Sequence, residues 1–189
     1  MDLKRLKEYA VAHHVPIVTD EGLSFLKETI QKNRIVHVLE IGTAIGYSAL
    51  AMASYGCLVD TFEKDEIMIE LAQRHFDRFD LHQQIRLLPF DALDYEGELK
   101  TYDLIFIDAA KAQYQRFFEK FAPLLNPRGL LICDNLRFHD LNPDHVNRHT
   151  KQLLRKIETF KTFLKNHPAF DTEFFMLGDG MSISQRKNK

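Results

Sequence analysis

Hydrophobic and polar positions alternate along most of the chain in two patterns. Short apolar runs begin at residue 35, and they cover residues 35–41, 57–62, 85–88, 104–107 and 130–133. The segments between several of these runs have the spacing of amphipathic helices, over residues 47–54, 65–80 and 112–125. Short apolar strands that alternate with helices form βαβ units, whose parallel sheet is buried on both faces. The pattern therefore predicts a doubly wound α/β fold.

The two ends of the chain extend this fold. Leu3 and Leu6 recur at helical spacing, and Asp20 is predicted to cap a second helix. A long helix is predicted over residues 143–166, followed by strands over residues 172–177 and 181–184, joined by a Gly-Asp-Gly turn. We expect one domain, with a seven-stranded, mostly parallel sheet, one antiparallel strand and helices on both faces. Residues 1–33 would be an N-terminal helical cap, and residues 34–189 the core.

The composition of the chain argues against several classes of protein. The chain has 189 residues and a formal net charge of −2, so nucleic-acid binding would need a local basic patch. No apolar run reaches the roughly 18–20 residues that span a bilayer, and the first residues lack the apolar core of a signal peptide. Cys57 and Cys133 fall in separate apolar runs, which argues against a disulfide. We therefore expect a cytoplasmic protein without a membrane partner.

A glycine-bearing turn follows the first predicted strand, within residues 38–48. Ligands of open α/β sheets bind at the carboxyl ends of the strands, where glycine lets the backbone approach closely. Glu63 ends the next strand and is placed to accept hydrogen bonds from ribose hydroxyls. Gly42 and Gly46 lack the third glycine of a dinucleotide site, and a Glu40 anion would disfavour a pyrophosphate. The turn favours a nucleoside ligand with a cationic methionine portion; the alternative is that both glycines serve the turn alone.

Three oxygen-bearing side chains follow the fourth and fifth predicted strands. Asp108 ends the fourth, and Asp134 and Asn135 end the fifth. Two carboxylates and an amide, with no thiolate or imidazole nearby, suit a hard cation such as Mg²⁺. Such an ion would lower the pKa of a substrate hydroxyl, and Lys111 would take its proton or stabilise the oxyanion. The arrangement predicts metal-assisted transfer chemistry.

Each of these residues also has an ordinary structural interpretation. Asp91 and Ala92 follow the third strand, where an adenine ring would lie, yet the pair is equally typical of a helix cap. Asp134 and Asn135 would serve as a capping pair, and Lys111 as a solvated side chain. Convergence of Asp134, Asn135 and Lys111 with Asp108 on one sheet edge favours the functional interpretation.

The residues described above resemble the metal-dependent O-methyltransferase family of catechol and caffeoyl-CoA methyltransferases, and the likeness covers nearly the whole chain. The resemblance implies a Rossmann-like class I methyltransferase fold, with S-adenosylmethionine and Mg²⁺, or Mn²⁺, as cofactors. It implies cofactor contacts at Val18, where relatives tend to carry Met, and at Gly42, Ser48, Glu63, Asp91, Ala92 and Asp108. It also implies metal ligands at Asp108, Asp134 and Asn135, and catalytic roles for Lys111 and Asp108.

Within that family, residues 9–17, 107–114 and 178–181 look most like the bacterial tRNA 5-hydroxyuridine methyltransferases. Those enzymes make 5-methoxyuridine at the wobble position, U34, so the resemblance implies the anticodon stem-loop of tRNA as partner, and a homodimer. O5 and O4 of 5-hydroxyuridine would chelate one metal as the vicinal oxygens of a catechol do. A small catechol-like or phenolic acceptor is therefore the alternative substrate. A nucleoside- or tRNA-binding protein without catalysis is the alternative from another class.

The long helix predicted over residues 143–166 carries a local excess of basic residues. Its apolar stripe is Val146, Leu153, Leu154, Ile157, Phe160 and Leu164, and its other faces hold Arg148, Lys151, Arg155, Lys156, Lys161 and Lys165. Such a face would follow phosphates, or it would simply be solvated. Arg137 and Phe138 follow the predicted metal ligands and are candidates for contact with the substrate base.

Overall fold

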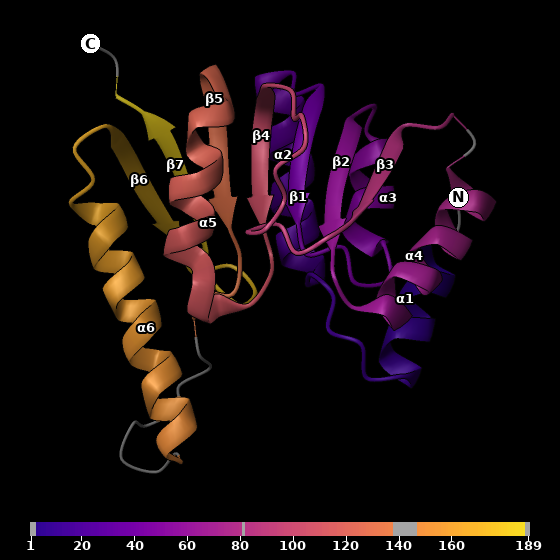
Figure 1. Cartoon of the computed structure of the whole chain (residues 1–189), viewed down its shortest axis with the longest axis horizontal. Helices are drawn as coiled ribbons and strands as arrows, with labels where there is room; N and C mark the ends of the chain where they lie inside the picture. The colour runs from indigo at the N-terminus through magenta and orange to yellow at the C-terminus, as the bar shows by residue number, and fades with distance from the viewer. Residues whose placement is uncertain (1–2, 81, 138–146, 188–189) are drawn as a thin grey trace.

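A seven-stranded sheet forms the centre of the protein, as the computed structural model of residues 3–80, 82–137 and 147–187 shows (Figure 1). Its strands are β1 (His37–Ile41), β2 (Leu58–Glu63), β3 (Ile85–Pro89), β4 (Tyr102–Ile107), β5 (Leu125–Cys133), β6 (Phe170–Phe175) and β7 (Met181–Arg186). Their order is β3-β2-β1-β4-β5-β7-β6. β7 is antiparallel to both of its neighbours, and the pairs among β1 to β5 are parallel. The predicted mostly parallel sheet with one antiparallel strand is confirmed.

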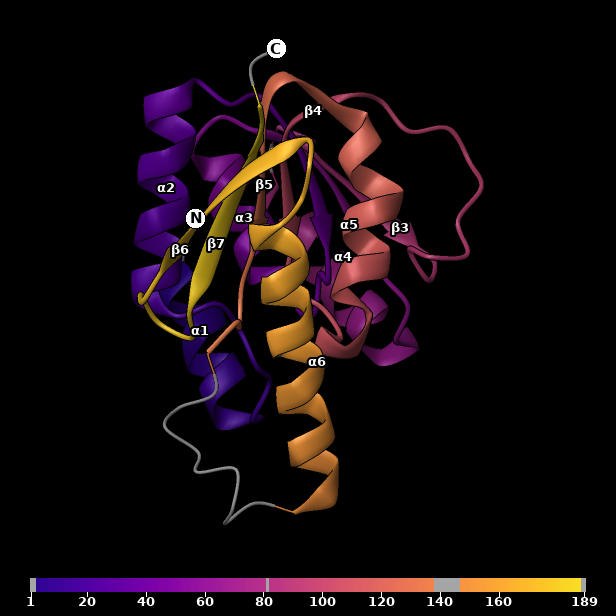
Figure 2. The ribbon, with the colours of Figure 1, turned by 90° about the vertical axis from the view of Figure 1, so that its left-hand side faces the viewer.

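Helices cover both faces of this sheet (Figures 1 and 2). They are α1 (Leu3–Ala12), α2 (Asp20–Asn33), α3 (Tyr47–Ser54), α4 (Glu66–Phe79), α5 (Tyr114–Phe121) and α6 (Arg148–Lys165), with 3-10 turns η1 (Lys111–Gln113) and η2 (Ala122–Leu124). Buried side chains of α1 to α4 pack on one face, and those of α5 and α6 pack on the other. The predicted doubly wound architecture is therefore present.

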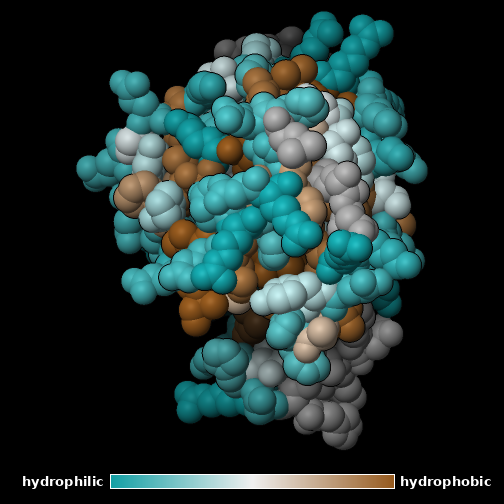
Figure 3. Space-filling view, turned by 90° about the vertical axis from the view of Figure 1, so that its right-hand side faces the viewer, coloured by the Kyte–Doolittle hydropathy of each residue, from teal (hydrophilic) through white to brown (hydrophobic). Residues whose placement is uncertain are grey.

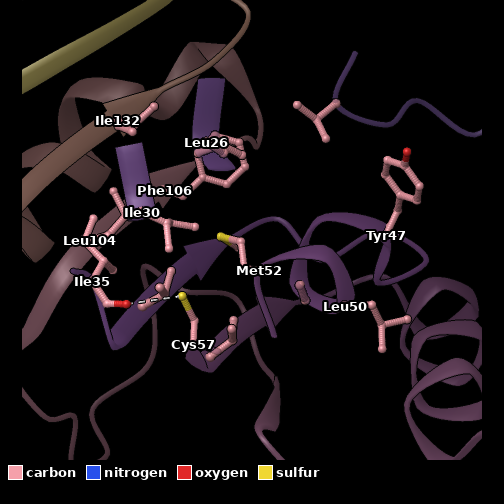
Figure 4. Packing of buried hydrophobic residues seen from close by; sticks show 14 of the residues in the cluster. Leu26, Ile30, Ile35, Tyr47, Leu50, Met52, Cys57, Leu104, Phe106 and Ile132 are labelled. Carbon is pink, nitrogen blue, oxygen red and sulfur yellow. Dashed lines mark hydrogen bonds between the residues drawn. The ribbon is translucent and has the colours of Figure 1, made fainter. Parts of the chain in front are cut away.

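Two hydrophobic layers account for the continuous apolar runs. Leu104 and Phe106 of β4 face one layer, with Leu26 and Ile30 of α2, as Figure 4 shows from close by. The alternate residues of β4, among them Ile105, face the other layer with α5 and α6. Every residue from Leu104 to Ile107 is fully buried, because side chains alternate between faces that are both covered.

The start of α2 differs from the prediction. The N-cap is Thr19 and not Asp20, because the Thr19 hydroxyl accepts a hydrogen bond from the amide of Gly22 at 3.1 Å. Asp20 is the first helical residue, where a carboxylate is favourable beside the helix N-terminus, and it pairs with Lys7 at 2.5 Å. The predicted cap was therefore wrong by one residue.

Other element boundaries also moved. The helix predicted over residues 112–125 is reduced to α5 with a 3-10 turn at each end, and Pro123 lies in the second turn, where it removes a backbone donor. β6 begins two residues earlier than predicted, because its ladder pairs Phe170 with Arg186. β5 begins at Leu125, five residues before the predicted strand. The two strand shifts follow from tertiary pairing, which local hydrophobicity does not encode, whereas the shortened helix follows from the local effect of Pro123.

The C-terminal helix α6 begins at Arg148, where the Asn147 side chain accepts a hydrogen bond from the amide of Thr150 at 2.9 Å. Residues 143–146 of the predicted helix, including Val146, lie outside the described residues, as does Phe138. The rest of the predicted apolar stripe is confirmed in part: Ile157, Phe160 and Leu164 are buried, whereas Leu153 and Leu154 are half-buried.

The outer surface is mostly polar. Figure 3 shows one side of the molecule, where hydrophilic side chains surround smaller hydrophobic patches. Exposed apolar side chains include Ile67 on α4 and Phe90 after β3. Within the described ranges, no helix combines the length and apolar character that crossing a membrane requires.

Candidate active site

The carboxyl ends of β1, β4 and β5 hold the candidate site at one edge of the sheet. The amide of Asp108 donates to the carbonyl of Ile41, and the amide of Asp134 donates to the carbonyl of Ile107, both at 3.0 Å. These bonds continue the parallel ladder past the strand ends, so that neighbouring strands deliver Asp108 and Asp134 to the same rim. The predicted convergence of these two residues is present.

A cavity of about 350 Å³ opens at this rim, within the usual range for small-molecule sites. Its lining includes every predicted cofactor, metal and catalytic residue except Asp134: Val18, Gly42, Ser48, Glu63, Asp91, Ala92, Asp108, Lys111 and Asn135, whereas the candidate base contact Arg137 is not part of it. Asp134 is 2% exposed and lies next to Asn135 in the chain. The structure therefore brings the predicted cofactor and catalytic residues to one cavity, with Asp134 buried beside it.

The glycine turn has a steric basis. Gly42 has a φ of +105°, and a Cβ there would lie 2.0 Å from the carbonyl oxygen of Asp108. Gly46 has a φ of +85° at the start of α3, and its Cβ would lie 2.5 Å from the ring of Phe76. Both glycines are required by packing, and Gly42 also lines the cavity.

Glu63 is held at the cavity wall by backbone amides. One carboxylate oxygen accepts from Ala44 at 2.8 Å, and the other accepts from Lys64 at 2.8 Å and Asp65 at 3.0 Å. A carboxylate has about four acceptor positions, so one remains for a ligand hydroxyl. The bonds to the loop backbone fix the carboxylate where the sequence predicts contact with ribose.

Glu40, in β1 just before the same turn, does not have the environment that the sequence suggested. It is fully buried, outside the cavity lining, and burial raises its pKa to about 8, partly offset by the nearby hydroxyls of Ser48 and Thr61. Thr61 donates to Oε2 at 2.5 Å, whereas Oε1 has no partner of normal hydrogen-bond geometry among the described residues. Burial therefore favours the protonated form of this carboxyl near neutral pH. The predicted effect of a Glu40 anion on a pyrophosphate is wrong, because the side chain is buried outside the cavity lining.

Asp91 caps a turn and does not begin a helix, since no helix occurs in residues 91–101. Its carboxylate accepts from the amide of Leu93 and from the ammonium of Lys64, both at 2.9 Å. The ammonium of Lys64, followed by the amide of Leu93, lowers the pKa of Asp91. The helix-cap interpretation is excluded for these residues, and Asp91 and Ala92 both line the cavity.

The proposed metal ligands are in direct contact. The Asn135 amide nitrogen donates to Oδ1 of Asp108 at 2.6 Å, and the Asn135 backbone amide donates to Oδ1 of Asp134 at 2.7 Å. Asn135 has a φ of +61°, a left-handed conformation that asparagine tolerates better than most residues. Coordination through the Asn135 side chain requires its amide to turn, so that oxygen replaces nitrogen toward Asp108.

The electrostatics of this group fit a divalent cation. Burial raises the pKa of Asp108 to about 6, and Lys111 partly offsets this. Burial and then the charge of Asp108 raise the pKa of Asp134 to about 7. The described residues hold no group of three His, Cys, Asp or Glu side chains arranged for a metal. Two carboxylates and an amide are nevertheless a donor set suited to Mg²⁺, and a cation would stabilise their ionised forms.

A third carboxylate was missed by sequence reasoning. Asp179 lines the cavity, and its charge raises the pKa values of both Asp108 and Asp134. The sequence presents Asp179 only as the centre of a Gly-Asp-Gly turn. The turn is anchored at the rim because the amide of Arg137 donates to the Asp179 carbonyl at 2.7 Å. A charged residue in a tight turn was the available signal, but its position depends on the pairing of β7 with β5.

Glu40 leads to a prediction about pH. A raised carboxyl pKa means that the folded state holds a proton that the unfolded state releases above pH 4.5, so stability falls as pH rises toward 8. One such group contributes up to about 1.4 kcal/mol per pH unit. We expect Glu40→Gln to reduce this fall, as measured by urea unfolding between pH 5 and pH 8.5. A slope identical to that of the wild type would contradict a protonated Glu40.

Comparison with known proteins agrees with this geometry. The family model for O-methyltransferases matches residues 1–187. A catechol O-methyltransferase of Niastella koreensis is 33% identical over 121 residues, 59% of this chain and 54% of that protein. A crystal structure from Staphylococcus aureus, provisionally assigned as a caffeoyl-CoA O-methyltransferase, has a TM-score of 0.93 at 36% identity, over 99% of this chain and 93% of that chain.

An O-methyltransferase from Bacillus cereus in complex with SAH shares the fold. It has a TM-score of 0.80 at 24% identity, over 98% of this chain and 90% of that chain. The match of the family model extends over the strands, the glycine turn and the rim residues described above. The chain belongs to the O-methyltransferase family.

Proposed function

We propose that this protein transfers the methyl group of S-adenosylmethionine to O5 of 5-hydroxyuridine at the wobble position of tRNA, with the assistance of Mg²⁺. One observation carries the proposal: Glu63, Asp108, Lys111 and Asn135 lie in the wall of a single cavity. The residue proposed to bind the nucleoside, Glu63, thus lies in the same cavity as the oxygen donors Asp108 and Asn135. A protein that only bound nucleosides would have no use for that combination.

The cofactor assignment rests on the chemistry of the cavity and on the family. Glu63 has one acceptor position left that would take a hydrogen bond from a ribose hydroxyl, and Gly42 would allow a ligand to approach the backbone closely. Asp91 and Ala92 line the part of the cavity proposed for adenine. S-adenosylmethionine supplies a methyl group on a sulfonium, and the SAH complex of the Bacillus cereus relative supports this choice of cofactor.

The residues around Asp108 would prepare the acceptor oxygen. Asp108, Asp134 and Asn135 would hold Mg²⁺, which when bound lowers the pKa of the acceptor hydroxyl. Lys111 lies three residues after Asp108 in η1 and lines the same cavity, where its side chain would take the hydroxyl proton or stabilise the oxyanion. Asp134 is buried behind this part of the rim, whereas Asp108 is half-buried and faces the cavity.

The RNA substrate is favoured over a small phenol by the residues of the chain that resemble the tRNA enzymes and by the charge of α6. Residues 148–165 contain six Lys or Arg and one Glu, on a chain whose formal net charge is −2. A phenol needs no such basic surface, whereas a polyanion does. The similarity to a catechol O-methyltransferase keeps a catechol-like acceptor as the second candidate.

The test is a comparison of acceptors. The protein is incubated with S-adenosylmethionine, Mg²⁺ and either an anticodon stem-loop carrying 5-hydroxyuridine or a simple catechol, and products are identified by mass spectrometry. We expect 5-methoxyuridine in the RNA at a kcat/KM at least tenfold above that for catechol. Turnover of catechol without formation of 5-methoxyuridine would reject the RNA assignment, and an unmodified-uridine stem-loop is the matched control.

A further inference from the structure

A second cavity lies beside the first, between α5 and α6. It has a volume of about 230 Å³, and we call it the α5–α6 groove. Its lining is Lys111, Ala112, Tyr114, Gln115, Arg155, Lys156, Thr159 and Phe160. Lys111 also lines the candidate active site, so the groove adjoins the catalytic cavity through this residue.

The floor of the groove is apolar and rigid. Tyr114 and Phe160 are 1% and 3% exposed, and their rings meet edge to face with centroids 5.6 Å apart. The Tyr114 hydroxyl donates to the backbone carbonyl of Asp134 at 2.9 Å. The floor is therefore attached to the strand end that holds the proposed metal ligands, and the groove keeps a fixed position relative to the site.

The walls of the groove are basic. Arg155 and Lys156 come from consecutive positions of α6 and are both exposed. Within residues 3–80, 82–137 and 147–187, neither side chain has an ion-pair or hydrogen-bond partner. Thr159 adds a hydroxyl, so the walls carry donors of the kind that bind phosphate oxygens.

Among the residues that the structure describes, two acids of α5 and α6, Glu119 and Glu158, are engaged by other groups. Glu119 accepts a hydrogen bond from the Gln115 amide at 2.9 Å, and Glu158 pairs with Lys161 at 2.8 Å. Lys165 lies over the ring of Phe174, 5.5 Å from its centroid. The basic side chains of α6 therefore differ: Lys161 and Lys165 have partners outside the groove, whereas Arg155 and Lys156 face the cavity that Lys111 shares.

α6 extends beyond the edge of the sheet that holds the candidate site. Figures 1 and 2 both show α6 projecting past the carboxyl ends of β4 and β5, along the side of α5. A polynucleotide whose base entered the candidate active site would carry its backbone outside the rim, where this helix stands. A free phenol or nucleoside has no phosphate to place there.

We propose that the α5–α6 groove binds a backbone phosphate of the RNA beside the nucleotide whose base enters the active site, through Arg155, Lys156 and Thr159. This inference rests on the proposed function, because it takes RNA as the substrate. It adds a specificity site: the groove distinguishes a nucleotide within a strand from a free nucleoside or a catechol.

Direct binding tests the groove without turnover. A fluorescein-labelled anticodon stem-loop with unmodified uridine is titrated with the protein in S-adenosylhomocysteine and Mg²⁺, and anisotropy gives Kd. We expect Arg155→Glu/Lys156→Glu to raise Kd on the order of tenfold or more, and to reduce the slope of log K against log salt by about 1 to 2. Arg155→Gln/Lys156→Gln should raise Kd by a smaller factor. It replaces the charge-reversed variant in the test if that variant folds poorly.

The matched control is Lys161→Glu/Lys165→Glu, which changes the charge of the same helix by the same amount outside the groove. An equal loss of affinity in this control would overturn the proposal, since it would indicate only the overall charge of α6. An unchanged Kd in the groove variant would overturn it as well. Replacing the phosphates beside the target nucleotide by neutral methylphosphonates should weaken binding to the wild type but not to the groove variant.

Failure of the groove and failure of the proposed function give different results. If the wild type binds the stem-loop through the groove but forms no 5-methoxyuridine from the modified RNA, phosphate binding by the groove is supported and the proposed reaction is rejected. If 5-methoxyuridine forms and the groove variant keeps the wild-type Kd and KM, the reaction stands and the groove proposal fails. Methylation of free 5-hydroxyuridine should be equal in wild type and variant.

Discussion

Asp134→Ala is expected to lower kcat on the order of 1000-fold while S-adenosylhomocysteine still binds, because the loss of several kcal/mol of metal assistance falls on the chemical step. Asp134 is buried next to Asn135 and outside the lining of the cavity, so the cofactor contacts remain. Steady-state kinetics with Mg²⁺ and calorimetric titration with S-adenosylhomocysteine measure the two effects separately.

The control for this variant is Asp171→Ala, which removes an acid from β6 whose side chain is 78% exposed, and it should leave both quantities unchanged. Chelation by excess EDTA should reproduce the loss of kcat in the wild type and change Asp134→Ala little further. Full activity of the wild type in EDTA, or a variant with normal kcat, would contradict the metal role of this residue.

Gly42→Ala is expected to destabilise the protein by about 3 kcal/mol or more and to abolish cofactor binding at ordinary concentrations. The new Cβ would lie 2.0 Å from the Asp108 carbonyl oxygen, so β1 and β4 must separate at the rim where Asp108 lines the cavity. Urea unfolding measures the stability, and titration with S-adenosylhomocysteine measures the binding.

Gly56→Ala separates the clash from the backbone conformation. Gly56 also has a positive φ, +95°, but a Cβ there meets nothing within 4 Å. The control should therefore lose only about 1 kcal/mol for the unfavourable φ and keep its cofactor affinity. Equal stability and equal affinity in the two variants would show that the close approach to Asp108 does not matter.

Sequence patterns predicted the sheet well because both faces of the strands are covered. Leu104–Ile107 is apolar at every position for that reason, and this makes buried strands visible without knowledge of their partners. The sequence did not indicate boundaries that depend on strand pairing, and β5 begins five residues before its predicted start. The cap of α2 was missed for another reason: Thr19 and Asp20 are neighbours of similar capping ability, and Thr19 takes the position.

Some residues of the candidate site could likewise be placed from the sequence, and others could not. Gly42, Asp108 and Asp134 directly follow β1, β4 and β5, which are neighbours in the parallel part of the sheet, so their positions at strand ends were enough to place them together. Asp179 reaches the rim through the antiparallel pairing of β7 and the bond from the Arg137 amide, and a charged residue in a tight turn does not by itself indicate that position. The charge state of Glu40 was misjudged because burial, which raises its pKa to about 8, is a property of the folded chain.

Binding of Mn²⁺ followed by electron paramagnetic resonance tests the ion site most directly, since it needs neither the RNA nor turnover. With S-adenosylhomocysteine present, we predict one bound Mn²⁺ per chain, displaced by Mg²⁺, and affinity at least tenfold weaker in Asp134→Ala. Unaltered Mn²⁺ affinity in that variant, or no bound ion in the wild type, would contradict the assignment of Asp108, Asp134 and Asn135 as its ligands.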